Sequence, residues 1–289
     1  MLKQPAVFSH DGRFMARWCD EDKLTLARAQ ATLSAELKTK LSPYCTHVKH
    51  HGGVKRSLRL LMRVLPAFCY VARFDVARYY ESIDHAVLLR QLQTLQVSQA
   101  SELIVQQYLA LPDRRNTGKG MIASGSLSTL LGAVMLTSLD QVMAAEIRTG
   151  RIWYIRYMDD FVVLAKTRHH FRRTMKKVHD VMRHLKLRLH RQQKCFIGKT
   201  NIGFDFLGYQ VCPNQKLYPS VVSIQRLTDR YRRLYEQGAD LKRLRQYVER
   251  WCCWHWGGLQ GRVLREGGVD KVLYWLQGTV SGFDLSPAG

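Results

Sequence analysis

Two adjacent carboxylates, Asp159 and Asp160, interrupt an otherwise apolar stretch whose pattern is typical of a β-hairpin. A third, Asp75, ends a predicted strand over residues 70–75. Neighbouring carboxylates in an apolar setting repel one another unless a cation neutralises them. Two Mg²⁺ ions, roughly 3.5–4 Å apart, can activate a hydroxyl and drive in-line displacement at phosphorus. The alternative for Asp159 and Asp160 alone is a solvent-exposed turn, where Asp is common.

The charge of the chain favours a polyanionic partner. Its 289 residues include 45 Lys and Arg against 23 Asp and Glu, a net charge of +22. The cations concentrate in residues 166–199 and again in residues 226–245. Such clusters attract nucleic acid, whose phosphate backbone can be bound without reading sequence. The alternative for each cluster is a solvated helix face.

Composition predicts a globular chain with a sizeable core, since 46% of the residues are hydrophobic. The nearly uncharged residues 120–145 contain too many polar side chains for a membrane span, and the N-terminus lacks a signal-peptide pattern. We therefore expect a cytoplasmic protein. The seven cysteines include no pair at C-x-x-C spacing, which argues against a disulfide framework and a structural zinc site.

Hydrophobic periodicity predicts the elements that must position the carboxylates. After the strand at 70–75, a helix begins with Asp84 as its N-cap. A single helix covers 127–145, and the hairpin strands lie near 152–155 and 161–164. An amphipathic helix then turns its basic side chains outward, because its apolar residues recur every three or four positions: Phe171, Met175, Val178, Met182 and Leu185. A β-rich segment over 195–211 precedes a helical C-terminal region, with helix breaks at glycines.

Residues 156–164, Arg-Tyr-Met-Asp-Asp-Phe-Val-Val-Leu, closely resemble the catalytic motif of reverse transcriptases, which are RNA-directed DNA polymerases. Residues 74–85 resemble the first catalytic motif of that family, in which an aromatic residue follows the Asp by five positions and Ile by eight. The resemblance implies that Asp75, Asp159 and Asp160 are catalytic and bind two Mg²⁺ ions, for which Mn²⁺ can substitute. It also implies that Tyr80 packs under the sugar and excludes a ribose 2′-hydroxyl.

Residues 120–133 resemble the family segment Gln-Gly-x-x-x-Ser-Pro-Leu-x-Ala, aligned on Gly125, Leu131 and Ala133. The chain departs from it with Ser124 in place of Gln, Thr129 in place of Ser and Leu130 in place of Pro. Polymerases of bacterial diversity-generating retroelements also replace that Gln and Pro. The departures therefore support a hypothesis of relaxed fidelity.

The family resemblance assigns further site residues. Arg13, Tyr80, Gly125, Tyr157 and Met158 would bind the nucleotide, with Arg13 on the triphosphate. Lys194 matches a lysine near the pyrophosphate, where an ammonium group can protonate or neutralise the leaving group. The hairpin that grips the primer would consist of Phe206, Leu207, Gly208 and Tyr209.

The resemblance implies an α+β, right-hand polymerase with a small antiparallel palm sheet backed by helices. Residues 1–70 would form shortened fingers, residues 71–214 the palm with inserted fingers elements, and residues 215–289 a helical thumb. The chain is most similar to the diversity-generating retroelement and group II intron-like bacterial enzymes, or to free-standing defence enzymes. Implied partners are an RNA template, a DNA or RNA primer, deoxynucleotides, and an accessory protein or structured non-coding RNA.

Two alternatives stay open at this point. The shortened fingers favour a catalytically silent, maturase-like RNA-binding protein, whereas the intact carboxylates oppose it, because unneutralised acids repel a phosphate backbone. An RNA-synthesising polymerase is the other alternative, and Tyr80 argues against it.

Overall fold

The computed structural model describes residues 6–10, 13–112, 117–123, 125, 127–190, 194–214, 216–259 and 268–281. The chain divides into two compact units, and helix α2 (Gly53–Val64) contributes residues to both. The first unit comprises Met1–Ser57 and Ala67–Gly198, and the second comprises Leu58–Pro66 and Lys199–Gly289.

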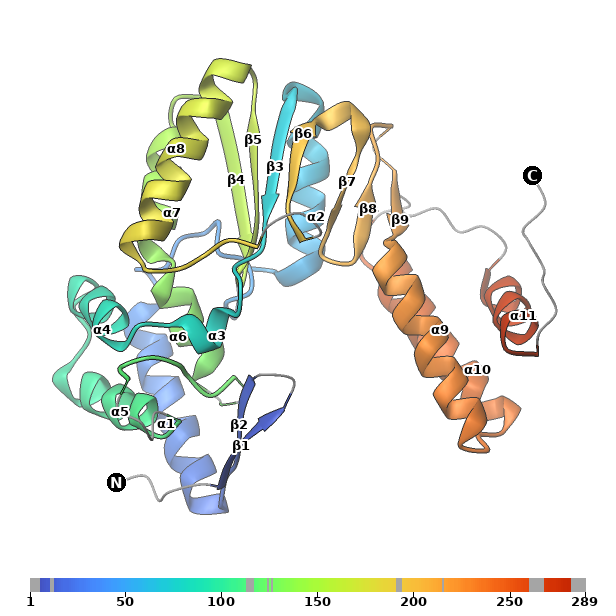
Figure 1. Cartoon of the computed structure of the whole chain (residues 1–289), viewed down its shortest axis with the longest axis horizontal. Coiled ribbons are helices and arrows are strands. Elements are labelled where there is room, and N and C mark those ends of the chain that lie inside the picture. The colour runs from blue at the N-terminus through green and yellow to red at the C-terminus, as the bar shows by residue number, and fades with distance from the viewer. Residues whose placement is uncertain are drawn as a thin grey trace. The chain divides into compact units, whose positions relative to one another are not determined.

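A four-stranded sheet lies at the centre of the first unit, in the order β4-β5-β3-β6 (Figure 1). Its strands are β3 (Tyr70–Phe74), β4 (Ile152–Tyr157), β5 (Asp160–Ala165) and β6 (Phe196–Lys199). Strand β5 pairs antiparallel with both β3 and β4, and the β4–β5 pair is the predicted hairpin. Residues 161–165 of β5 are fully buried, as an apolar central strand requires.

Helices α7 (Thr137–Ile147) and α8 (Arg168–His184) pack against this sheet and against each other (Figure 1). The predicted amphipathic character of α8 is confirmed, because its apolar residues Phe171, Met175 and Val178 are buried in the core. Its basic side chains therefore line the exposed side of the helix.

Helix α4 (His85–Thr94) begins as predicted, with the Asp84 carboxylate accepting the Val87 backbone N–H at 3.0 Å. The same carboxylate forms an ion pair with Lys186 at 2.7 Å. This unit also contains strands β1 (Ala6–His10) and β2 (Arg13–Arg17), and helices α1 (Asp20–Leu37), α3 (Tyr79–Ser82), α5 (Gln99–Ala110) and α6 (Ser128–Met135). The 3₁₀ turn η1 (Leu65–Ala67) lies at the boundary, with Leu65 in the second unit and Ala67 in the first.

The prediction of one continuous helix over 127–145 is wrong, because α6 and α7 meet at Leu136 with a bend of 51°. In an unbroken helix the Ala133 carbonyl would accept the backbone N–H of Thr137. Here that carbonyl accepts from the Thr137 hydroxyl at 3.5 Å and from the Arg156 guanidinium at 3.2 Å. Within the described residues no single helix is long and apolar enough to span a membrane; the bent pair meets the length and composition criteria only when its two helices are joined.

In its described residues the second unit combines a three-stranded antiparallel sheet with helices α9 (Val221–Glu236), α10 (Leu241–Trp256) and α11 (Gly268–Ser281) and the C-terminal part of α2. The strands are β7 (Phe204–Phe206), β8 (Tyr209–Val211) and β9 (Leu217–Pro219), and the 3₁₀ turn η3 (Thr200–Ile202) precedes them. Helices α9, α10 and α11 enclose a core of their own around Leu227, Tyr231 and Val248. The mixture of helices with small antiparallel sheets confirms the predicted α+β class.

Candidate active site

The three predicted carboxylates lie at one end of the central strands. Strand β3 pairs with β5 through Phe74 and Phe161, so one further step in this register places Asp75 opposite Asp160. Asp159 occupies the two-residue turn between β4 and β5. The structure thus gathers carboxylates that are 85 positions apart in the sequence, and it does so by strand register alone.

Arg73 binds the carboxylate of Asp160 with both arms of its guanidinium. Its Nε and Nη2 atoms each lie 3.0 Å from one carboxylate oxygen, and the two side chains are 18% and 15% exposed. Burial raises the pKa of the Asp160 carboxyl above its usual value, Arg73 partly offsets this rise, and the charge of Asp75 adds to it. Sequence reasoning did not identify Arg73.

Asp75 is held by the loop that follows α8. The backbone N–H of His190 donates to the Asp75 carbonyl at 2.9 Å, and that of Ala77 donates to the Arg188 carbonyl at 2.7 Å. The His190 Nε2 atom lies 3.6 Å from the Asp75 carboxylate. Cys195 donates its thiol to the His190 carbonyl at 2.6 Å, and burial raises the pKa of this thiol. His190 and Cys195 therefore belong to the surroundings of Asp75, which no local pattern indicated.

The turn that carries Asp159 is held by hydrogen bonds to Met158 from two sides. Met158 has a left-handed backbone, with φ of 58°, and its N–H donates to the Nδ1 atom of His47 at 2.9 Å. The Met158 carbonyl accepts from the Arg156 Nη1 atom at 2.9 Å. Burial, together with the charge of Arg156, lowers the pKa of His47 to about 3. Neutral His47 can therefore accept this hydrogen bond at neutral pH.

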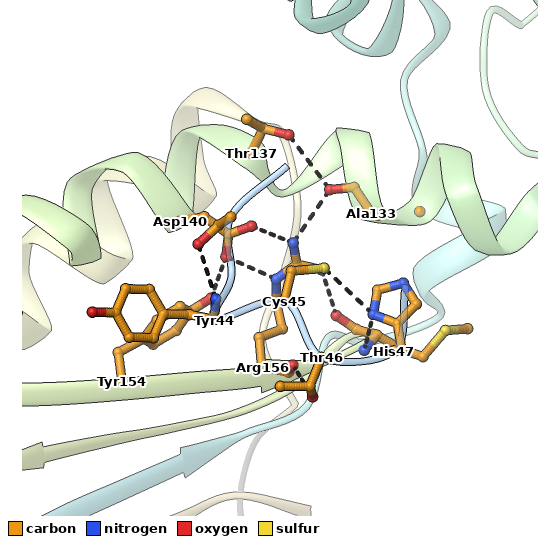
Figure 2. A network of polar contacts seen from close by, with 12 residues as sticks. Tyr44, Cys45, Thr46, His47, Ala133, Thr137, Asp140, Tyr154 and Arg156 are labelled. Atoms are coloured by element: carbon orange, nitrogen blue, oxygen red, sulfur yellow. Dashed lines mark hydrogen bonds and ion pairs between the residues drawn. The ribbon is translucent and has the colours of Figure 1, made fainter. Parts of the chain in front are cut away.

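Arg156 supports the turn from a fully buried position (Figure 2). It forms an ion pair with Asp140, whose carboxylate also accepts the Tyr154 hydroxyl at 2.8 Å. Burial alone would lower the pKa of Arg156, but the charge and hydrogen bond of Asp140, together with Cys45 and Tyr154, keep this pKa above its usual value. Outside the sheet, the Tyr44 carbonyl accepts the Arg156 backbone N–H at 2.9 Å, and the Thr46 N–H donates to the Arg156 carbonyl at 2.8 Å. The hairpin is thus tied to α7 and to the 44–46 segment.

Tyr80, predicted to lie under the nucleotide sugar, packs beside Tyr79 with a distance of 5.5 Å between ring centroids. The hydroxyl of Tyr79 donates to the Gly132 carbonyl in α6 at 2.6 Å. A Cβ atom on Gly132 would lie 3.3 Å from the Tyr79 ring and 3.7 Å from the Tyr80 ring. Glycine at this position therefore lets α6 approach the Tyr79 ring closely, and the Gly132 carbonyl holds that ring through its hydroxyl.

Gly125 lies against Tyr108, and a Cβ atom there would be 1.8 Å from the Tyr108 hydroxyl oxygen. Its carbonyl accepts the Ser128 hydroxyl at 2.6 Å. Ser124 lies outside the described residues, as does the side chain of Arg13. The described Lys194 is exposed, and no hydrogen bond or ion pair joins it to the three carboxylates in the described part of the chain.

The four predicted primer-grip residues form one turn of the second unit. Phe206 and Tyr209 pair across β7 and β8, while Leu207 and Gly208 occupy the turn with φ of 50° and 83°. The Tyr209 hydroxyl donates to the His255 carbonyl at 2.9 Å, so α10 anchors this hairpin. His255 and Cys252 are buried in this unit, and Cys252 belongs to its hydrophobic core.

A groove of about 1620 Å³ opens beside β3 in the first unit, reaching Phe74, His190 and Cys195. Its walls carry five Lys and Arg side chains, which are Arg78, Lys119, Arg183, Lys186 and Arg188. A groove with this charge is suited to phosphate groups.

The carboxylates only partly fit a divalent-metal centre. Among the described residues, no group of three or more His, Cys, Asp or Glu side chains is arranged to hold a metal ion. Asp75 and Asp159 offer the oxygen ligands that Mg²⁺ prefers. Both oxygens of Asp160 accept hydrogen bonds from Arg73.

A small antiparallel sheet that presents carboxylates at one end and is backed by helices defines a nucleic-acid polymerase fold of the α+β class. The model of the reverse transcriptase (RNA-dependent DNA polymerase) family matches residues 27–211. The chain therefore belongs to the reverse transcriptase family. No curated protein sequence matches the chain.

Solved structures of telomerases share the fold. A Candida tropicalis apo telomerase truncated from its C-terminal domain is 11% identical, with a TM-score of 0.57 over 75% of this chain. Another Candida tropicalis apo telomerase is 9% identical, with a TM-score of 0.56 over 88%. Candida albicans telomerase in complex with a fragment of telomeric RNA is 11% identical, with a TM-score of 0.51 over 89%. This chain covers 54%, 54% and 50% of the three, about half the length of the proteins it matches.

Proposed function

We propose that the chain is an RNA-directed DNA polymerase that adds deoxynucleotides to the 3′ end of a primer. The observation that carries this proposal is the register that sets Asp75 opposite Asp160, with Asp159 in the adjoining turn. Family membership and the net charge of +22 support it. Template RNA, a DNA or RNA primer and deoxynucleotides are the proposed partners.

Within this proposal, divalent cations of the Mg²⁺ class would lower the pKa of the primer hydroxyl and balance the charge on the departing pyrophosphate. Asp75 and Asp159 would hold them. The ring of Tyr80 would leave no room for a 2′-hydroxyl, and the cationic groove beside β3 would attract phosphate groups. Arg13 and Lys194 would act on the triphosphate and pyrophosphate.

The proposed division into domains places fingers and palm before residue 215 and the thumb after it. The separate core around Leu227, Tyr231 and Val248 supports an independent helical thumb. The hairpin at Phe206–Tyr209 would contact the primer, where Gly208 allows close backbone approach.

The finer proposal is a role in a diversity-generating retroelement or in phage defence, with relaxed fidelity. It rests on Thr129 and Leu130, which replace the Ser and Pro of the family segment, and on Ser124 in place of Gln. Sequencing of the cDNA tests it. A Ser124→Gln, Leu130→Pro double variant should make fewer errors than the parent chain, and equal error rates would remove the support.

Primer extension on a defined RNA template tests the polymerase proposal. Reactions at low salt with Mg²⁺, and then with Mn²⁺, should yield cDNA from the parent chain and none from Asp159→Ala. Low salt is needed because binding to a phosphate backbone weakens steeply as salt is added. Lys38→Ala, an exposed substitution after α1 and outside both basic clusters, is the control for a change of charge away from the carboxylates.

The alternative function is maturase-like RNA binding without catalysis. It predicts that neither chain extends a primer while both bind RNA equally. The assay is then repeated with the products of neighbouring genes added. Primer extension in their presence would show that an accessory partner was missing, and its continued absence would show a catalytically silent protein.

A further inference from the structure

The pair formed by Arg73 and Asp160 changes the expected metal site. We infer that Asp160 serves as the ion-pair partner of Arg73 and not as a ligand for a divalent cation, so that this role falls to Asp75 and Asp159. Arg73 is then a positioning residue, which sets how many carboxylates the site offers. This inference rests on the proposed function for the class of ligand, and the metal-binding and stability measurements below do not require polymerase activity.

Strand register explains why the pair forms. Side chains two positions apart on a strand share one face, so Arg73 and Asp75 point to the same side of β3. Because Arg73 is paired with Val162, Asp160 on β5 also lies on this face, opposite Asp75 and diagonal to Arg73. Diagonal neighbours are within reach of a long side chain, and Arg73 makes two hydrogen bonds of 3.0 Å across this diagonal.

The pair of Arg73 and Asp160 also reduces the repulsion between the carboxylates of the site. Asp160 is largely buried, and burial together with the charge of Asp75 disfavours its ionised form. A planar guanidinium that donates to both carboxylate oxygens stabilises the charge and fixes its orientation. Without Arg73, Asp75 and Asp160 would face each other as like charges on one sheet face.

The same geometry disfavours Asp160 as a metal ligand. A dication approaching either oxygen of Asp160 would come close to the guanidinium, whose charge has the same sign. Asp75 differs, because the His190 Nε2 atom is 3.6 Å from its carboxylate, beyond normal hydrogen-bond length. The site would therefore carry a charge of −2 toward the cation rather than −3.

Binding of Mn²⁺ to the full chain, followed by electron paramagnetic resonance without nucleotide or nucleic acid, tests the ligand assignment. Asp75→Asn and Asp159→Asn should each weaken Mn²⁺ binding by about tenfold or more, because each removes a carboxylate ligand. Asp160→Asn should change it by less than about threefold. Loss of affinity in Asp160→Asn equal to that in Asp159→Asn would overturn the inference.

Arg73→Met supplies the converse test. It frees the Asp160 carboxylate, so Mn²⁺ should bind more tightly than to the parent chain, by about threefold or more. The double variant Arg73→Met, Asp160→Asn should bind Mn²⁺ like the parent chain. A tenfold loss in the double variant would show that Asp160 is a ligand.

Thermal unfolding without metal tests the pair itself. Arg73→Met should lower Tm by roughly 5–10 °C, because it leaves a mostly buried carboxylate unpaired, and adding Asp160→Asn should restore most of the loss. Additive losses would overturn the pairing. Arg173→Met, which breaks a pair with Glu146 on α7, is the matched control and should leave Mn²⁺ binding unchanged. If these results hold while primer extension fails, the proposed function fails and this inference stands.

Discussion

His47 accepts the Met158 backbone N–H at its Nδ1 atom, while its Nε2 atom lies 3.2 Å from the Thr129 carbonyl. A carbonyl oxygen can only accept, so Nε2 carries the proton and Nδ1 is bare. The imidazole is therefore neutral, with one fixed tautomer. It joins the first turn of α6 to the turn that carries Asp159.

This hydrogen-bond pattern predicts a pH dependence of stability. The pKa of His47 is about 3 in the folded chain and about 6.5 when exposed. Between these values the unfolded chain binds a proton that the folded chain does not, so stability falls as pH decreases from about 6.5 toward 3. His47→Asn keeps an acceptor near the position of Nδ1 but does not titrate. We therefore expect its Tm to fall less than that of the parent chain between pH 7 and pH 5.

The matched control is His50→Asn, an exposed substitution on the same segment, which should keep the slope of the parent chain. Differential scanning fluorimetry over this pH range gives all three slopes. Equal slopes for His47→Asn and the parent chain would contradict the assigned tautomer.

The buried pair of Arg156 and Asp140 predicts a large loss of stability on removal of one partner. Asp140→Asn leaves the fully buried guanidinium without its counter-charge, which costs about 3–5 kcal/mol. Urea denaturation measures this loss. Replacing both charges, in Arg156→Met with Asp140→Leu, should cost less than Asp140→Asn alone, and a larger loss in the double variant would contradict the explanation.

The elements of the first unit that could be predicted have local signals. The apolar repeat of α8, the Asp84 cap and the hairpin at Asp159 are each read from residues within one helix or one strand pair. The break at Leu136 could not be predicted, because it depends on Arg156 of β4. The Arg156 guanidinium donates a hydrogen bond to the Ala133 carbonyl.

The carboxylates of the candidate site could be predicted from the sequence. The residues that hold them in place could not. Arg73 and Asp160 are 87 positions apart, and His47 and Met158 are 111 positions apart. The first contact depends on the register of β3 against β5, and the second on the segment around Cys45, which lies beside Arg156 of β4. Neither arrangement can be deduced from a single sequence. Arg73 lies two positions before Asp75. Its contact with Asp160 could have been predicted only by assuming that β3 pairs with β5.

The contact between Gly125 and Tyr108 predicts that no larger residue is tolerated at position 125. In Gly125→Ala the new methyl group would lie 1.8 Å from the Tyr108 hydroxyl oxygen, so the segment must shift. We expect a loss of roughly 1–3 kcal/mol in urea denaturation. Removing the hydroxyl with Tyr108→Phe, which also removes its 3.0 Å hydrogen bond to the Ile122 carbonyl, should recover part of that loss. Strictly additive losses would contradict the steric explanation.

The position of Tyr80 predicts its effect on the choice of sugar. Its ring packs beside that of Tyr79, which is fixed by its own hydrogen bond to Gly132, so we expect Tyr80→Ala to open space without moving the neighbouring ring. In primer extension with competing nucleotides, Tyr80→Ala should reduce the preference for deoxynucleotides over ribonucleotides by about tenfold or more. Tyr80→Phe keeps the ring and should keep the preference. Tyr79→Phe, which loses only the 2.6 Å hydrogen bond to Gly132, should lower stability without changing sugar preference. An unchanged preference in a Tyr80→Ala chain that still extends primers would show that another side chain excludes the 2′-hydroxyl.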